Sequence, residues 1–309
     1  MKPIPDVDPA DAREILESCL GVGNLEISRT DAGALANSFR CSTGNSTVII
    51  QFYDRTLAHE LANEQRYRDQ LVALDVPLRD VLGEGWHNGA HYTIYREPNG
   101  RGLDELSADE LSAALPEVFD LILRIAEVDV GGTTGFGWMD ENGNGMHDSW
   151  SAHLEYVGDE EPGMFFGAWH HMFDDTFLER DRFNRYMALM RESLDSIDAS
   201  RRLVHGSFGY DRVRVSEGRV VALLNWMDAR YGDTLYDVAN MGYWWTHLDI
   251  VGLFQRHCSD RGVSFDDYRR RIAACRYFIA LDCMRYFAKV DDRRAYDGAV
   301  AIAEAADRE

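Results

Sequence analysis

Lysine is nearly absent from this chain of 309 residues, since Lys2 and Lys289 are its only lysines. Asp and Glu number 53 against 32 Lys and Arg, which gives a formal net charge of −21 at pH 7. Such a surface repels nucleic acid and anionic membranes, so neither is an expected partner. An acidic, lysine-poor surface is typical of a halophilic protein, because high salt screens its self-repulsion. A GC-rich bacterial source, or an acidic cleft for a polycationic substrate, would also give such a composition.

Paired cysteines and long apolar runs are also missing. The five cysteines are scattered, odd in number and form no C-x-x-C motif, so they indicate neither a disulfide framework nor a zinc site: Cys19, Cys41, Cys258, Cys275 and Cys283. No apolar run approaches the roughly 18 residues that cross a bilayer. The acidic, proline-bearing N-terminal residues do not resemble a signal peptide. These absences predict a globular, cytoplasmic protein.

The first hundred residues have the pattern of a small β-rich lobe. Strand-like runs lie at 25–29, 37–41, 46–52 and 89–96, and helical spacing is found at 11–20 and 58–74. The composition changes at Pro98, Asn99, Gly100 and Gly102, a cluster typical of a hinge. We therefore expect an N-lobe at residues 1–99 and a second lobe at residues 100–309.

The second lobe has mainly helical patterns, at 108–128, 148–156, 176–197, 235–246 and 265–288 and near the C-terminus. One β-hairpin interrupts them, with strands at Arg212–Val215 and Val220–Leu224 around the turn Ser216–Arg219. A β-rich lobe, a hinge and a larger helical lobe with a hairpin predict an α+β fold of the bilobal, protein-kinase-like type.

The most specific motif lies between Val204 and Ala239. The motif residues that remain are His205, Gly206, Phe208 and Gly209 in a loop, Trp226 after the hairpin, and Gly232 and Asp233 before a helix. Their order and spacing resemble the aminoglycoside phosphotransferase family, in which H-x-D-x-x-x-x-N, a hairpin, a metal-binding loop and a Gly-Asp turn follow one another. The glycine-rich stretch Thr133–Trp150 is similar to an insert of the hygromycin-type phosphotransferases. The resemblance implies a kinase-like fold, with ATP and Mg²⁺ as cofactors if the protein is active.

Three positions of this motif have lost the residues that the family uses. Ser207 stands at the position of the aspartate that accepts the substrate proton, and a serine is no useful base, so a contribution of about 10²- to 10⁴-fold would be missing. Asn225 stands at the position of the aspartate that binds Mg²⁺, and it lacks the negative charge. Arg212 stands at the position of the asparagine that holds a metal, and a guanidinium ligates no metal.

The nucleotide-binding positions of the first lobe are altered as well. Gln51 lies where the family has a lysine or arginine that reaches the α- and β-phosphates, with Glu64 of the following helix as its expected partner. A shift of register by one residue would bring Ile50 or Phe52 there, and neither is a cation. Gly33 is a candidate for a phosphate-covering loop, although the repeated glycines of such loops are absent.

Arg212 has two possible roles. It could take over the electrostatic role of the metal towards a phosphate or carboxylate. It could instead pair with a nearby carboxylate, such as Asp211 or Asp228, and bind nothing. We expect no metal site, and Asp228 and Asn225 would be the ligands, with Asp211 near by, if one exists.

These substitutions predict a pseudokinase of the aminoglycoside phosphotransferase family that binds a small molecule, a nucleotide or a partner protein. The first alternative is an active ATP-dependent kinase with atypical metal ligation, which phosphorylates a hydroxyl of a small, aminoglycoside-like substrate. The second alternative is a non-catalytic interaction scaffold. Natural and engineered loss of the catalytic residues both fit the sequence, and the identity of the ligand stays open.

Overall fold

The computed structural model describes residues 4–30, 35–44, 46–163, 165–194, 200–209 and 211–306. The chain divides into two compact units, and each consists of two segments. Unit 1 contains Met1–Ala114 and Tyr210–Met227, and unit 2 contains Leu115–Gly209 and Asp228–Glu309. Unit 1 thus includes the hairpin in addition to the N-terminal segment, and the lobe boundary at residue 99 stays a prediction.

Unit 1 is built on a five-stranded antiparallel sheet with the order β1-β2-β3-β5-β4. Its strands are β1 (Ile27–Thr30), β2 (Ala36–Thr43), β3 (Ser46–Asp54), β4 (Asp80–His87) and β5 (Ala90–Arg96). Four of these strands were predicted, and β4 was missed. A break in register between Val81 and Gly83, together with a second glycine at Gly85, disrupts the alternation by which a strand is recognised.

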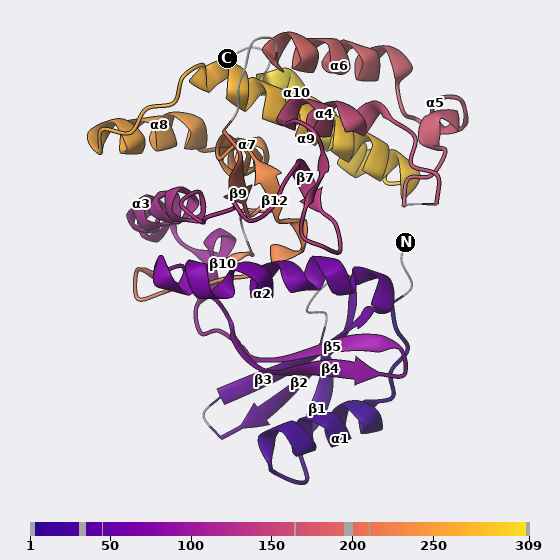
Figure 1. Cartoon of the computed structure of the whole chain (residues 1–309), viewed down its shortest axis with the longest axis vertical. Helices are drawn as coiled ribbons and strands as arrows, with labels where there is room; N and C mark the ends of the chain where they lie inside the picture. Colours follow the sequence, from indigo (N-terminus) through magenta and orange to yellow (C-terminus); the bar gives the residue numbers. More distant parts are fainter. Residues whose placement is uncertain are drawn as a thin grey trace. The chain divides into compact units, whose positions relative to one another are not determined.

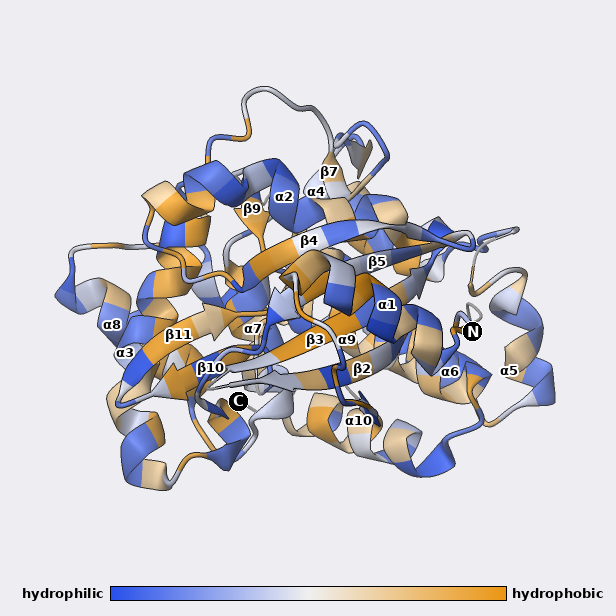
Figure 2. Ribbon diagram, turned by 90° about the horizontal axis from the view of Figure 1, so that it is seen from below, coloured by the Kyte–Doolittle hydropathy of each residue, from blue (hydrophilic) through white to orange (hydrophobic). Residues whose placement is uncertain are grey.

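The two faces of this sheet differ in polarity because side chains alternate along each strand. On one face, Phe39, Ile50 and Phe52 belong to a hydrophobic core that also contains Ala12 and Leu16 of α1 (Pro9–Leu20). The opposite face carries three buried polar side chains in one cross-strand row: Ser38, Gln51 and Thr93. Figure 1 shows the sheet between α1 and α2 (Ala58–Ala73). In Figure 2 the outward side of α1 is hydrophilic, whereas β3 is largely hydrophobic.

The predicted hairpin is confirmed as β10 (Val213–Ser216) and β11 (Arg219–Leu223), and β6 (Arg101–Gly102) extends it to a three-stranded sheet. Ser216 pairs with Arg219, so the turn has two central residues, Glu217 and Gly218. Both have positive φ angles, 50° and 76°. This is the geometry that two-residue hairpins favour, because it matches the twist of the strands.

Unit 2 is mainly helical. Its helices are α4 (Trp150–Glu155), α5 (Met172–Asp175), α6 (Arg180–Leu194), α7 (Leu235–Trp244), α8 (Ile250–Asp260), α9 (Tyr268–Lys289) and α10 (Arg293–Ala306), and α3 (Ala108–Ile125) ends in it. Helices α6, α7 and α10 pack against α9, whose buried residues include Cys275, Phe278 and Leu281. A small sheet has the order β8-β7-β12-β9, with strands β7 (Phe136–Met139), β8 (Gly145–His147), β9 (Arg202–Val204) and β12 (Arg230–Gly232). The sequence did not predict this sheet, because its strands have only three or four residues. Helix α8 was not predicted either.

Arg285 of α9 is the centre of a buried ion-pair cluster in unit 2. Its side chain is 1% exposed, and its Nη1 donates a hydrogen bond to Glu161 Oε1 at 2.8 Å. Its Nε donates to Asp282 Oδ1 at 3.1 Å. The guanidinium carbon lies 3.7 Å from the centroid of the Phe166 ring. A charge this deep is tolerated because partners surround it on several sides.

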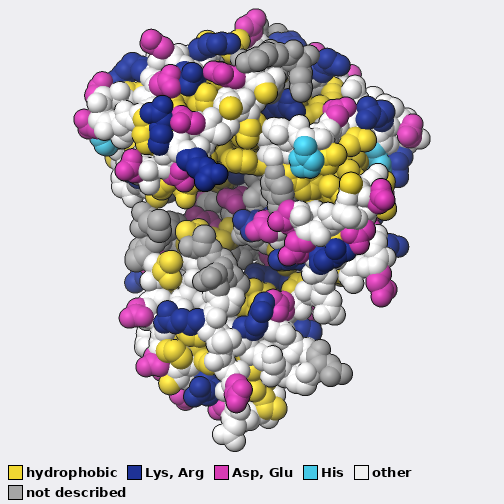
Figure 3. Space-filling view, turned by 180° about the vertical axis from the view of Figure 1, so that it is seen from behind, with side chains coloured by type: hydrophobic (Ala, Val, Ile, Leu, Met, Phe, Trp, Pro, Cys, Tyr) yellow, Lys and Arg dark blue, Asp and Glu magenta, His cyan; other side chains and the backbone are white. Residues whose placement is uncertain are grey.

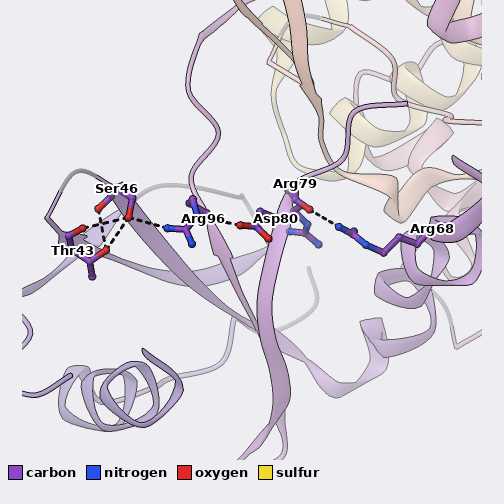
Figure 4. Close-up of polar contacts among 6 residues, drawn as sticks. All are labelled: Thr43, Ser46, Arg68, Arg79, Asp80 and Arg96. Atoms are coloured by element: carbon purple, nitrogen blue, oxygen red, sulfur yellow. Dashed lines mark hydrogen bonds and ion pairs between the residues drawn. The ribbon is translucent and has the colours of Figure 1, made fainter. Parts of the chain in front are cut away.

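Acidic and basic side chains are interspersed over the face of the molecule shown in Figure 3. Figure 4 follows one run of surface contacts in unit 1, in which Arg96 donates to Asp80 at 3.1 Å and to Ser46 at 3.0 Å. Exposed pairs of this kind contribute less than about 1 kcal/mol each, so their screening by salt costs the fold little. No helix within the described ranges is long and apolar enough to cross a membrane.

Candidate functional site

The predicted catalytic loop follows β9 in unit 2, and its backbone is held by a carboxylate that the sequence did not reveal. Asp237 of α7 accepts hydrogen bonds from the backbone N–H groups of His205 (2.9 Å) and Gly206 (2.8 Å). Burial raises the pKa of Asp237 to about 6, against these donors, which lower it. The His205 ring is fully buried and makes an edge-to-face contact with Phe208 at 5.5 Å. Asp237 thus fixes the loop that carries Ser207.

Gly206 makes this loop geometry possible. Its φ angle is 84°, and a Cβ atom built there would lie 2.0 Å from the carbonyl oxygen of Asp228. The same carbonyl accepts a hydrogen bond from Arg230 Nε at 3.1 Å. Glycine is needed here both for the backbone conformation and for the close approach of two chain segments.

Ser207 is half-buried, and its Oγ is shielded from solvent without a hydrogen-bond partner among the described residues. Among the described residues, therefore, no base orients or activates the hydroxyl. Asp228, one of the two candidate replacement carboxylates, is half-buried in the same unit. Asp233 accepts a hydrogen bond from the first amide of α7, that of Leu235, at 2.9 Å, and it forms a two-pronged ion pair with Arg271 at 2.6 and 2.7 Å.

Arg230 packs beside a buried histidine in unit 2, His153. Its guanidinium lies 4.9 Å from the Trp138 ring and 4.6 Å from the Tyr236 ring, and Nη1 is 3.4 Å from Nε2 of His153. Because arginine can only donate, Nε2 of His153 accepts, and the imidazole is neutral. Burial, and secondarily Arg230 and His147, hold the pKa of His153 well below its usual value.

We expect unit 2 to lose stability in mild acid because of His153. Below about pH 6.5 the unfolded chain binds a proton at this residue and the folded chain does not, so His153 lowers the free energy of unfolding by about 1.4 kcal/mol per pH unit. Above that pH His153 is neutral in both the folded and the unfolded chain and no longer lowers the free energy of unfolding. Below about pH 6 the raised pKa of Asp237 offsets part of this fall, because the folded chain takes up a proton there. Denaturant unfolding between pH 7 and pH 5.5 measures the decline, and His153→Gln, which keeps an acceptor for Arg230, should flatten it. His171→Gln, at an exposed histidine, is the control and should change nothing.

In unit 1, Gln51 stands at the expected position of the phosphate-binding cation, and its side chain is hydrogen-bonded to other residues of the sheet. Gln51 is 5% exposed, and its Oε1 accepts a hydrogen bond from the Tyr53 hydroxyl at 2.9 Å. Its Nε2 is 3.4 Å from Ser38 Oγ. Gln51 is therefore part of a polar row on the sheet face and brings no charge to it.

Glu64 of α2 has two arginine partners, and neither was predicted. Its Oε1 accepts from Arg68 Nη1 at 2.6 Å and its Oε2 from Arg79 Nε at 3.2 Å. Arg68 Nη2 also donates to the carbonyl oxygen of Arg79 at 2.9 Å, as Figure 4 shows. No sequence pattern pointed to Arg79, because the residue lies in the short segment before β4, a strand that was itself missed.

Arg212 and Asp211 form an ion pair in unit 1, with 2.7 Å between Nη1 and Oδ2. Their side chains are 36% and 59% exposed, so the pair adds little stability. This pairing is the one expected for the second of the two roles considered for Arg212. Asn225 has a φ angle of 65°, a left-handed conformation that asparagine tolerates better than most residues. Gly33 lies outside the described residues. In the described part of the chain, no three His, Cys, Asp or Glu side chains are grouped so that they could hold a metal.

Comparisons with known proteins agree with this architecture. A model of the phosphotransferase enzyme family matches residues 26–274. Hygromycin-B 4-O-kinase from Escherichia coli is 29% identical over 191 residues, which cover 58% of this chain and 52% of that protein, about half its length.

Two solved structures share the fold over nearly their whole length. A thermostable mutant of aminoglycoside phosphotransferase APH(4)-Ia, in a ternary complex with ADP and hygromycin B, has a TM-score of 0.76 at 23% identity, with 96% of this chain and 98% of that chain covered. Spectinomycin phosphotransferase APH(9)-Ia, in complex with ADP and spectinomycin, has a TM-score of 0.70 at 10% identity, with 99% and 100% covered. The chain therefore has the kinase-like fold of aminoglycoside phosphotransferases and belongs to the phosphotransferase enzyme family.

Proposed function

We propose that this protein is a nucleotide-binding pseudokinase, in which Arg212 takes the electrostatic role of the missing metal. The observation that carries the proposal is the pair of substitutions at the metal-binding positions, where Asn225 is neutral and Arg212 is positively charged. In the structure Arg212 pairs with Asp211, which is also what its alternative, purely local role predicts. In this pair a guanidinium neutralises the carboxylate that could otherwise replace a metal ligand. The pair is exposed, so its guanidinium can exchange Asp211 for a phosphate at little cost.

The charges at the altered positions support binding of an anion without a metal. Gln51 and Asn225 are neutral and Arg212 is cationic, so the altered positions of unit 1 sum to +1. Mg²⁺ usually takes at least one carboxylate from the protein, and these positions offer it a neutral amide and a cation. The residues therefore do not fit the metal that the family uses.

The same residues disfavour turnover. Phosphoryl transfer depends on positioning and on neutralising the charge of the phosphoryl group, and a base takes the proton of the substrate hydroxyl. Arg212 can supply positive charge, whereas Ser207 cannot accept the proton. Nucleotide is the proposed ligand because proteins with this fold have been solved with ADP and with AMP-PNP.

Thermal unfolding with ADP or ATP, with and without Mg²⁺, tests this function. We expect both nucleotides to raise the Tm, and to raise it equally in the presence of Mg²⁺ or EDTA. At a ligand concentration of about 100 Kd, mass action adds roughly 2.7 kcal/mol, which amounts to several degrees. Arg212→Ala should remove most of the rise, and Arg219→Ala in the hairpin turn is the matched control.

The other outcomes separate the alternatives. A rise that requires Mg²⁺ would overturn the role of Arg212 and favour an active kinase with metal ligation through Asp211 or Asp228. If neither nucleotide changes the Tm in either condition, the interaction scaffold becomes the better interpretation. The measurement should be repeated at high salt, where non-specific attraction between charges is screened.

A further inference from the structure

Arg79 occupies the position next to Glu64 where a kinase-type strand cation would have its charged group. The resemblance pairs Glu64 with a cation on β3, yet the residue there is Gln51. The structure instead brings Arg79, which immediately precedes β4, to Glu64 Oε2 at 3.2 Å. The glutamate of this pair is thus retained, and its cation comes from another part of the sheet.

The guanidinium of Arg79 is oriented and has donors to spare. Its carbon lies 4.9 Å from the centroid of the Tyr95 ring, which holds the planar group in one orientation. Arginine has five N–H donors, and Glu64 takes only the one on Nε. The side chain is 14% exposed, and the Tyr53 hydroxyl also hydrogen-bonds it, so its neighbours hold the group while a small part of the side chain reaches solvent.

Tyr53 connects Arg79 to the position of the lost cation. The Tyr53 hydroxyl donates to Gln51 Oε1 at 2.9 Å. The same hydroxyl interacts electrostatically with both Arg79 and Arg212, although burial dominates and raises the pKa of this tyrosine. Arg79 therefore lies at the polar sheet face near Gln51, and Arg212 is close enough to act electrostatically on the same hydroxyl.

The balance of charge around this point is positive in a chain that is strongly negative. Arg68, Arg79 and Arg212 contribute +3, and Glu64 and Asp211 contribute −2, so the group sums to +1. The whole chain carries −21. An excess of guanidinium groups on such a chain favours a bound anion, and guanidinium groups match the geometry of phosphate oxygens.

The geometry points to Arg79 as the residue that binds the phosphates of the nucleotide, in place of the cation that Gln51 cannot supply. This inference rests on the proposed nucleotide binding and adds a residue to it. Arg79 and Arg212 then act on the same phosphates, Arg79 from the segment before β4 and Arg212 from the hairpin.

The test compares the binding of ADP and adenosine, in EDTA, to the purified full-length chain by calorimetry. Arg79→Gln should weaken ADP binding by about 10- to 100-fold, the factor expected for one or two charge-assisted hydrogen bonds. Adenosine, which has no phosphate, should bind equally well to both proteins. Gln51→Arg added to Arg79→Gln should restore ADP affinity, because it returns a cation to β3 beside Glu64.

Arg96→Gln is the matched control, since Arg96 lies on β5 of the same sheet but binds Asp80 and Ser46, outside this group. It should leave ADP affinity unchanged. If Arg79→Gln weakens ADP and adenosine alike, Arg79 has only a structural role and the inference is wrong. If the unaltered protein binds ADP and Arg79→Gln binds it equally well, only the inference about Arg79 fails. Absence of ADP binding to the unaltered protein would overturn the proposed function as well.

Discussion

Arg285→Ala should lower the free energy of unfolding by about 3–5 kcal/mol, the largest loss of stability that we expect from a single substitution in this chain. The reason is that Glu161 is 9% exposed and would keep its charge without the partner that now lies 2.8 Å away. The contact of the guanidinium with the Phe166 ring would be lost too. Chemical denaturation followed by circular dichroism measures the effect.

The control for this prediction is Arg293→Ala on α10. Arg293 pairs with Asp297 at 2.9 Å, but their side chains are 61% and 57% exposed, so the substitution should change stability by less than about 0.5 kcal/mol. A second variant, Arg285→Met with Glu161→Leu, removes both charges and should recover most of the loss. Equal losses from Arg285→Ala and Arg293→Ala would show that the buried cluster does not stabilise unit 2.

Restoring the family residues at three positions should produce the largest change in activity. The variant Ser207→Asp, Arg212→Asn, Asn225→Asp regains a base, removes the cation that repels Mg²⁺ and returns a carboxylate ligand. We expect Mg²⁺-dependent ATP hydrolysis at least about 10²-fold above that of the unaltered protein, because a base alone contributes about that much. Release of inorganic phosphate measures the rate.

The variant that carries only Arg212→Asn and Asn225→Asp is the control for the base, and it should hydrolyse ATP more slowly than the triple variant. If the triple variant folds, binds ATP and remains inactive, another residue needed for catalysis is missing from unit 1, where Gln51 and Arg79 differ from the family pattern. An unaltered protein that already hydrolyses ATP as fast as the triple variant would contradict the pseudokinase interpretation.

The sequence predicted those elements whose signals are local. The hairpin was recognised because Glu217 and Gly218 lie between two alternating runs, and the structure gives both a positive φ. The long helices were recognised from their periodicity, and α9 and α2 begin within three residues of their predicted starts. The fold followed from these elements and from the motif around His205, and the comparisons confirm it.

The residues that the sequence did not reveal depend on contacts between distant segments. Asp237 looked like an ordinary helical residue, and its role depends on His205 and Gly206, about 30 positions earlier in the chain, whose amides it accepts. Arg79 was not predicted for the same reason. Its contact with Glu64 forms only when α2 packs against the sheet. No pattern of period two or 3.6 encodes such pairs.

The path of the catalytic loop and the reactive group that it carries depend on different residues. Asp237 accepts hydrogen bonds from two backbone N–H groups of the loop, and Gly206 packs closely against the Asp228 carbonyl. Neighbouring residues therefore define the path of the chain around position 207. The Ser207 side chain contributes no hydrogen bond to that path within the described structure. Position 207 is therefore a place where natural selection, or a mutagenesis library, can exchange one reactive group for another while the protein continues to fold.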